Sequence, residues 1–182
     1  MQNNTNQQFD EAVKSCKEIF INKSRDYGTS WRVYRQKSLA DQIYIKAKRI
    51  RTIQEKQQQM IMDDIPSEFM GILNYAVIGL IQLDLKDTDS DEIELKEAER
   101  MYDEKIAGAK KLMQDKNHDY GEAWREMSQE SFVDLILSKV LRIKQILSNE
   151  GKTIISEGID ANLYDILNYA VFAIIMQENI KS

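Results

Sequence analysis

Residues 23–32, KSRDYGTSWR, decide the fold because they return as KNHDYGEAWR at residues 116–125. Extending this comparison at a constant shift of 93 positions aligns 23–53 with 116–146, and 14 of the 31 positions are identical. Similarity over this length at a fixed spacing is typical of an internal repeat. The sequence therefore predicts that one structural unit occurs twice in tandem.

A stretch further along each unit, which we expect to be its third helix, is repeated as well. One extra residue in the second half aligns ILNYAV at 72–77 with ILNYAV at 166–171. These segments are apolar on nearly every side, which is typical of a helix buried in the centre of a protein. We expect the two copies to bury these helices against each other, as the two subunits of a symmetric dimer would.

The remaining segments of each unit also have helical character. The chain contains one proline and seven glycines, so residues that interrupt helices are scarce. Apolar residues recur at helical spacing over 9–23 and over 38–58. We therefore predict an all-α bundle of two three-helix repeats, at 1–88 and 89–182, related by pseudo-twofold symmetry and packed as one compact unit.

Composition limits the classes of function. Hydrophobic residues make up 42% of the 182 residues and charged residues 30%, which is typical of a globular chain with a sizeable core. The net charge of −5 argues against a duplex nucleic-acid binder. A single cysteine, Cys16, excludes an internal disulfide. No signal peptide or membrane-spanning segment is apparent, so we expect a cytoplasmic protein without a membrane partner.

Each repeated Asp-Tyr-Gly segment is expected to form a turn. Gly28 and Gly121 suit a positive φ, and Asp26 and Asp119 suit hydrogen bonds to nearby backbone amides. The S-x-x-D patterns at Ser38 and Ser131 predict capped starts for the second helices. The neighbouring aromatic residues fit either the core or a surface that stacks on a base. They are Tyr27, Trp31, Tyr120 and Trp124.

A repeated pair of cations is the most informative polar feature. In the second helix of the first unit, Lys46 falls within the apolar arc and Arg49 flanks it. Lys139 and Arg142 hold the same places in the second unit. A cation that points inward must meet an anion, because burying an unpaired charge is costly. Polar residues share one face of each third helix; they are Glu68, Gly71 and Asn74, and then Asn162, Asp165 and Asn168.

Two interpretations of this arrangement remain open. In the first, Lys46 or Arg49 pairs with Glu68, and a cation of the second unit pairs with Asp165, so that ion pairs only hold the helices in register. In the second, each unit has a polar pocket in which the basic pair binds phosphate and aromatic rings enclose a base. The acids would then bind a sugar hydroxyl or Mg²⁺.

The order K-x-x-DYG-x-x-W, K-x-x-R and D-x-x-NYA resembles the nucleotide modification associated domain 1 family, once in each half of the chain. The resemblance implies a small helical protein associated with nucleotide or DNA-base modification. Carried over by position, it implies as site residues Asp119, Tyr120, Trp124, Lys139, Arg142, Asp165 and Asn168, together with Asp26, Tyr27, Trp31, Lys46, Arg49 and Asn74. The first unit departs from the pattern at Gly71, so either that site is degenerate or Glu68 supplies its acid.

Three functions are compatible with these residues. The preferred hypothesis is a protein that binds a nucleotide or a nucleotide derivative through its inward cations. The second is a Mg²⁺-dependent all-α nucleotide pyrophosphohydrolase with Glu68 and Asp165 as metal ligands, although neither repeat has the paired ExxE and ExxD motifs of such enzymes. The third is a non-catalytic helical scaffold with internal ion pairs. Whether two chains pair as a homodimer is left open.

Overall fold

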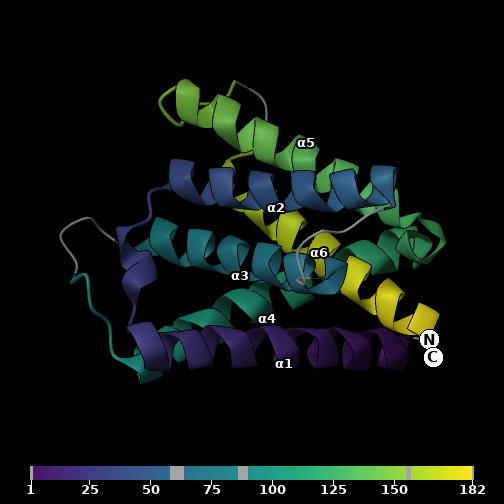
Figure 1. Ribbon diagram of the computed structural model, residues 1–182, viewed down its shortest axis with the longest axis horizontal. Coiled ribbons are helices and arrows are strands. Elements are labelled where there is room, and N and C mark those ends of the chain that lie inside the picture. The colour runs from purple at the N-terminus through teal and green to yellow at the C-terminus, as the bar shows by residue number, and fades with distance from the viewer. Residues whose placement is uncertain (1, 58–63, 86–89, 155–156, 182) are drawn as a thin grey trace.

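The computed structural model describes residues 2–57, 64–85, 90–154 and 157–181, and all regular secondary structure in this part of the chain is helical (Figure 1). The first repeat consists of α1 (Gln2–Tyr27), the short 3-10 helix η1 (Ser30–Val33), α2 (Gln36–Lys56) and α3 (Ile65–Asp84). The second consists of α4 (Leu95–Tyr120), η2 (Ala123–Glu126), α5 (Gln129–Ser148) and α6 (Ile159–Lys181).

The helix bounds confirm the tandem duplication. Helices α1 and α4 each contain 26 residues, and they begin 93 positions apart, as do η1 and η2 and also α2 and α5. Helices α3 and α6 begin 94 positions apart, in agreement with the extra residue in the second half. The all-α prediction is therefore confirmed. The predicted boundary between residues 88 and 89 lies outside the described residues.

The helices form three layers, and each layer takes one helix from each repeat (Figure 1). Helices α3 and α6 pack against each other in the middle layer. Helices α2 and α5 cover one side of it, while α1 and α4 cover the other. This arrangement buries the most apolar helix of each repeat between polar-faced helices, as expected from the hydrophobic effect.

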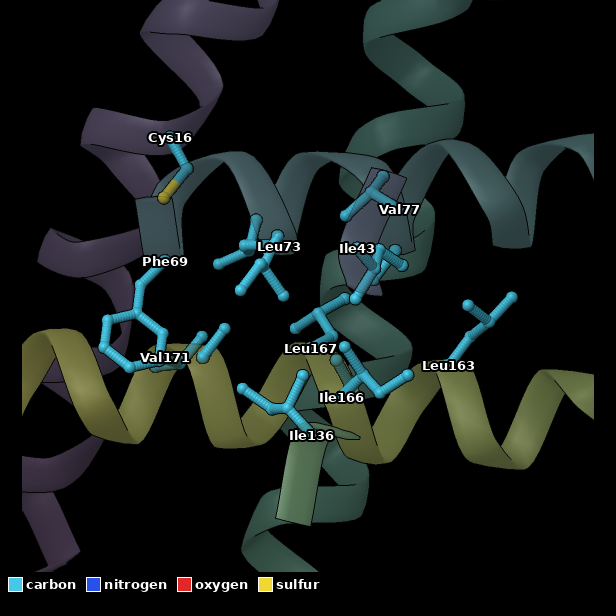
Figure 2. Close-up of a cluster of buried hydrophobic side chains, with 14 of the residues drawn as sticks. Cys16, Ile43, Phe69, Leu73, Val77, Ile136, Leu163, Ile166, Leu167 and Val171 are labelled. Atoms are coloured by element: carbon cyan, nitrogen blue, oxygen red, sulfur yellow. The ribbon is translucent and has the colours of Figure 1, made fainter. Parts of the chain in front are cut away.

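Figure 2 shows the core between the layers. Leu73 and Val77 of α3 lie among Leu167 and Val171 of α6. Ile43 of α2 and Ile136 of α5 reach the same cluster, and Cys16 extends it toward α1. Because these side chains come from five helices, neither repeat could bury its third helix by itself. The two repeats therefore share one hydrophobic core.

Helix α6 differs from one expectation. Its stretch Ile159–Glu178 is long and apolar enough to cross a membrane, judged by length and composition, and it is the one such helix within the described ranges. In the bundle, 67% of that apolar window is buried. The contacts of α6 with α3 and α5 account for this burial, because α6 lies in the middle layer.

The starts of α2 and α5 correct the predicted caps. Helix α2 begins at Gln36, after Arg35, which makes no side-chain cap hydrogen bond. Helix α5 begins at Gln129, and its cap is Ser128, whose hydroxyl accepts the backbone N–H of Ser131. The prediction that Ser38 and Ser131 are caps is therefore wrong, because both helices start two residues earlier.

The aspartates of the supposed caps instead join the two repeats. Asp41 of α2 pairs with Lys144 of α5 at 2.6 Å, and Asp134 of α5 pairs with Arg51 of α2 at 3.5 Å. These two pairs are related by the pseudo-twofold axis, because each position of one is shifted by 93 in the other. All four side chains are one-third exposed or more, so the pairs contribute at most about 1 kcal/mol each.

Candidate functional site

The repeated Asp-Tyr-Gly segment ends the first helix of each repeat. Gly28 and Gly121 have φ angles of 64° and 63°, which confirms the predicted left-handed turn. The expected hydrogen bonds of the aspartates are not formed, because among the described residues neither Asp26 nor Asp119 accepts a backbone N–H. Asp119 instead contacts the ring of the adjacent histidine at 3.1 Å. The turn geometry that the two repeats share therefore comes from the glycines.

The aromatic residues of this segment divide into two groups. Tyr27 and Tyr120 are 71% and 77% exposed. Trp31 and Trp124 are buried in the core, and neither indole N–H has a hydrogen-bond partner within the described part of the chain. Trp124 stacks on Phe172 with ring centroids 4.3 Å apart. The tryptophans therefore fit the core interpretation, and Tyr27 and Tyr120 are the rings open to a ligand.

The asparagines of the third helices connect the inner layer to the outer one. The side chain of Asn74 donates to the carbonyl of Cys16, and that of Asn168 donates to the carbonyl of Ala109, which is the equivalent position in α4. The Oδ1 atom of Asn74 accepts from the hydroxyl of Tyr102. Both asparagines thus have a structural role in positioning α1 and α4.

In the first repeat, Glu68 receives both predicted cations. Arg49 donates to its Oε1 at 2.7 Å and Lys46 to its Oε2 at 3.3 Å. Glu68 is buried, while the two cations keep about a quarter of their side-chain surface. A Cβ on Gly71 would lie 2.8 Å from Cε of Lys46, so the lysine chain passes directly over the glycine. The first repeat therefore has its acid one helical turn earlier than the second.

In the second repeat, Asp165 receives one cation that was predicted and one that was not. Lys139 and Lys116 each lie 2.7 Å from its carboxylate, while Arg142 is exposed and takes no part. The expectation that Arg142 points inward is therefore wrong. Burial alone would raise the pKa of Asp165, but the hydrogen bonds from the two lysines outweigh burial and hold this pKa below its usual range.

A pocket of about 520 Å³ opens beside the first ion-pair cluster. Helices α1, α2 and α3 and the turn at Gly28 form its walls. Its lining includes two cations, Lys23 and Lys46, the acid Glu68 and the amide of Asn74. Five aromatic residues also line it, namely Phe20, Tyr27, Trp31, Tyr34 and Tyr75. Burial raises the pKa of Tyr75, and the neighbouring Tyr34 raises this pKa further, so the phenol stays protonated near neutral pH.

Larger side chains occupy the corresponding places in the second repeat. Asp165 takes the position of Gly71, and Phe172 takes that of Ile78, which lines the first pocket. The ammonium of Lys116 pairs with Asp165, whereas Lys23, at the same place in α1, has no ion pair within the described ranges. Beside the ion-pair cluster the pocket therefore lies in the first repeat, where the chain of Lys46 takes the place over Gly71. A hollow of about 700 Å³ in the second repeat lies elsewhere and includes Arg142 and Asn162 in its lining.

Glu68 and Asp165 do not fit the magnesium site that the hydrolase hypothesis requires. Each carboxylate is already bound by two cations. Within the described ranges, no group of three or more His, Cys, Asp and Glu side chains is placed to hold a metal ion. A hard divalent cation prefers several oxygen ligands that are free of competing positive charges.

The predicted site residues did not include Lys23, Tyr34 and Tyr75, which also line the pocket. For Lys23 a signal was present, because lysine recurs at position 116 in the repeated K-x-x-DYG motif. Tyr75 recurs as Tyr169 within the ILNYAV segment, but the apolar pattern of this segment indicates a core helix and gives no sign that Tyr75 lines a pocket. Tyr34 has no such signal, because methionine replaces it in the second repeat.

Comparison with known proteins identifies a family. The family described as nucleotide modification associated domain 1 matches residues 23–83 and again residues 116–176. The two matched segments begin at Lys23 and Lys116, and each covers the turn and the second and third helices of one repeat. No curated protein and no solved structure matches the chain.

Proposed function

The chain belongs to the nucleotide modification associated domain 1 family, and from this premise we propose that it binds a nucleotide or a nucleotide derivative in the pocket of its first repeat. The observation that carries the proposal is the joint lining of one pocket by two lysines and three tyrosines, Tyr27, Tyr34 and Tyr75. Ammonium groups suit a phosphate, and aromatic faces suit a base.

The size and chemistry of the pocket support a small ligand of this kind. Its volume of about 520 Å³ lies within the range of roughly 300–1,000 Å³ that is usual for small-molecule sites. Tyr27 is exposed at the pocket and is free to stack on a flat ring. The carboxylate of Glu68 provides a polar group on the α3 wall for a ligand hydroxyl.

The second candidate function is a helical scaffold, and the second repeat favours it. Lys139 and Lys116 are matched by Asp165, as internal ion pairs of a scaffold would be. In the first repeat, Lys46 is also matched, but a pocket lies beside it. We therefore infer that the first repeat binds the ligand and that the second repeat has mainly a structural role. The link to nucleotide or DNA-base modification follows from the family name alone.

Calorimetric titration with nucleosides, nucleoside monophosphates and nucleoside triphosphates tests the proposal. Tyr27→Ala removes an exposed ring at the pocket and leaves the core intact. Its matched control is Tyr120→Ala, at the same position of the other repeat and equally exposed. We expect binding that Tyr27→Ala weakens and Tyr120→Ala leaves unchanged. Absence of binding for the whole panel, or equal effects of the two variants, would refute the proposal.

A further inference from the structure

The second repeat contains an anion held between two lysines. The carboxylate of Asp165, on α6, accepts from Lys116 of α4 through Oδ1 and from Lys139 of α5 through Oδ2, both at 2.7 Å. Asp165 is 7% exposed, so the carboxylate lies within the protein rather than on its surface. Three helices of this repeat thus converge on one negatively charged group.

The first repeat presents the equivalent lysines without the equivalent acid. Lys23 of α1 and Lys46 of α2 both line the pocket, together with Gly71, which replaces Asp165 on α3. Lys23 has no ion-pair partner in the described part of the chain. Lys46 lies 3.3 Å from Glu68, while Arg49 binds the same carboxylate at 2.7 Å. Glu68 therefore keeps its closer partner if Lys46 turns toward a ligand.

We propose that an anionic group of the ligand, a phosphate monoester, binds between Lys23 and Lys46 over Gly71, where the carboxylate of Asp165 lies in the second repeat. The inference rests on the proposed function in that it uses the same pocket. It names the part of the ligand that the lysines recognise. Because the chain of Lys46 now lies over Gly71, this flexible side chain moves aside when the phosphate binds. Asp165 fills the second site with the protein's own anion, so that site takes no ligand.

The physical reason is charge compensation. In the second repeat, Asp165 compensates both lysines from within the chain. In the first repeat, Glu68 compensates Lys46 and Arg49 but not Lys23, and a doubly charged phosphate monoester supplies the missing anion from solution. Hydrogen bonds between ions are stronger than neutral ones, so this contact contributes more to affinity than any single contact to a hydroxyl.

Calorimetry with three probes tests this inference: a nucleoside monophosphate, the matching nucleoside and inorganic phosphate. We expect the monophosphate to bind about tenfold to a hundredfold more tightly than the nucleoside, as losing a charge-assisted contact implies. Lys23→Ala should remove that difference in affinity, because it removes one of the two lysines that bind the phosphate. The variant should keep its fold, because Lys23 is exposed. Lys116→Ala, the matched change in the other repeat, should preserve the difference in affinity.

A reciprocal exchange is the sharper test. Gly71→Asp gives the first repeat the acid of the second, and we expect it to remove the preference for the monophosphate. Lys46 has to move for this, because its flexible chain lies over the glycine. Asp165→Gly should create a second phosphate site, seen as a rise in stoichiometry from one to two. If the glycine unfolds α6, Asp165→Ala opens the same space with a better helix former.

The outcomes separate this inference from the proposed function. Equal binding of nucleoside and monophosphate, weakened by Tyr27→Ala, overturns the phosphate site and leaves the nucleotide pocket standing. Binding of inorganic phosphate that Lys23→Ala abolishes, without binding of any nucleoside or nucleotide, supports the phosphate site and refutes the nucleotide. Equal losses in Lys23→Ala and Lys116→Ala, or no binding of any probe, overturn the inference.

Discussion

Asp165→Asn should destabilise the protein more than the matching change in the first repeat. The substitution keeps the shape of the side chain and removes its charge, so that Lys116 and Lys139 lose their partner. Lys116 is 49% exposed and water can solvate it, so losing its ion pair with Asp165 costs at most about 1 kcal/mol. Lys139 is only 13% exposed, and an ammonium left nearly buried costs about 2–3 kcal/mol.

The sum is about 3 kcal/mol, which for a chain of this size lowers the melting temperature by roughly 6–12 °C. Glu68→Gln is the matched control. Its partners, Lys46 and Arg49, are 27% and 22% exposed and lie at or beside the pocket, where water can reach them. We therefore expect a smaller cost of about 1–2 kcal/mol for this variant. Urea unfolding at neutral pH measures both costs.

The destabilisation by Asp165→Asn should also depend on pH. Because the lysines lower the pKa of Asp165 in the folded protein, the unfolded chain binds a proton more readily than the folded one. The ion pairs therefore stabilise the wild type near neutral pH, and this contribution is lost as the pH falls below the usual aspartate pKa of about 4. Below this pH, the difference in the free energy of unfolding between the wild type and Asp165→Asn should become smaller. Equal costs for Asp165→Asn and Glu68→Gln, or a difference that is independent of pH, would refute this reasoning.

Two further predictions concern side chains of α1 and α4. Tyr102→Phe should cost about 1–3 kcal/mol in urea unfolding, because it leaves Oδ1 of Asn74 without its partner, whereas Phe9→Tyr should stabilise by about 1 kcal/mol. Phe9 corresponds to Tyr102 by the shift of 93 positions, and Asn168 is the counterpart of Asn74. Because Oδ1 of Asn168 is buried without a hydrogen bond, the new tyrosine hydroxyl is expected to donate to it. A loss of stability in Phe9→Tyr would contradict this expected hydrogen bond. Burial raises the pKa of the Cys16 thiol to about 12, so a thiol reagent should modify Cys16 only as fast as the protein unfolds, and rapid labelling of the native protein would contradict its burial.

Part of the candidate site could be predicted from the repeats. The inward direction of Lys46 and Lys139 followed from helical periodicity, and both lysines do meet acids of the third helices. The choice of the second partner could not be predicted. Arg49 joins Lys46 in the first repeat, but Lys116 replaces Arg142 in the second. The reason is the position of the acid, since moving it by one helical turn brings it within reach of a different cation.

The amino-acid sequence by itself predicted the six α-helices of the described residues, their division into two equivalent units and the burial of the third helix of each unit. These features depend on local periodicity and on similarity within the chain, which can be read without coordinates. Only the tertiary structure decided which unit has the pocket. That outcome depends on whether an acid or the chain of Lys46 lies at the position of Gly71, and on the partner that Lys116 meets. Both are set by side chains from separate helices packed against one another.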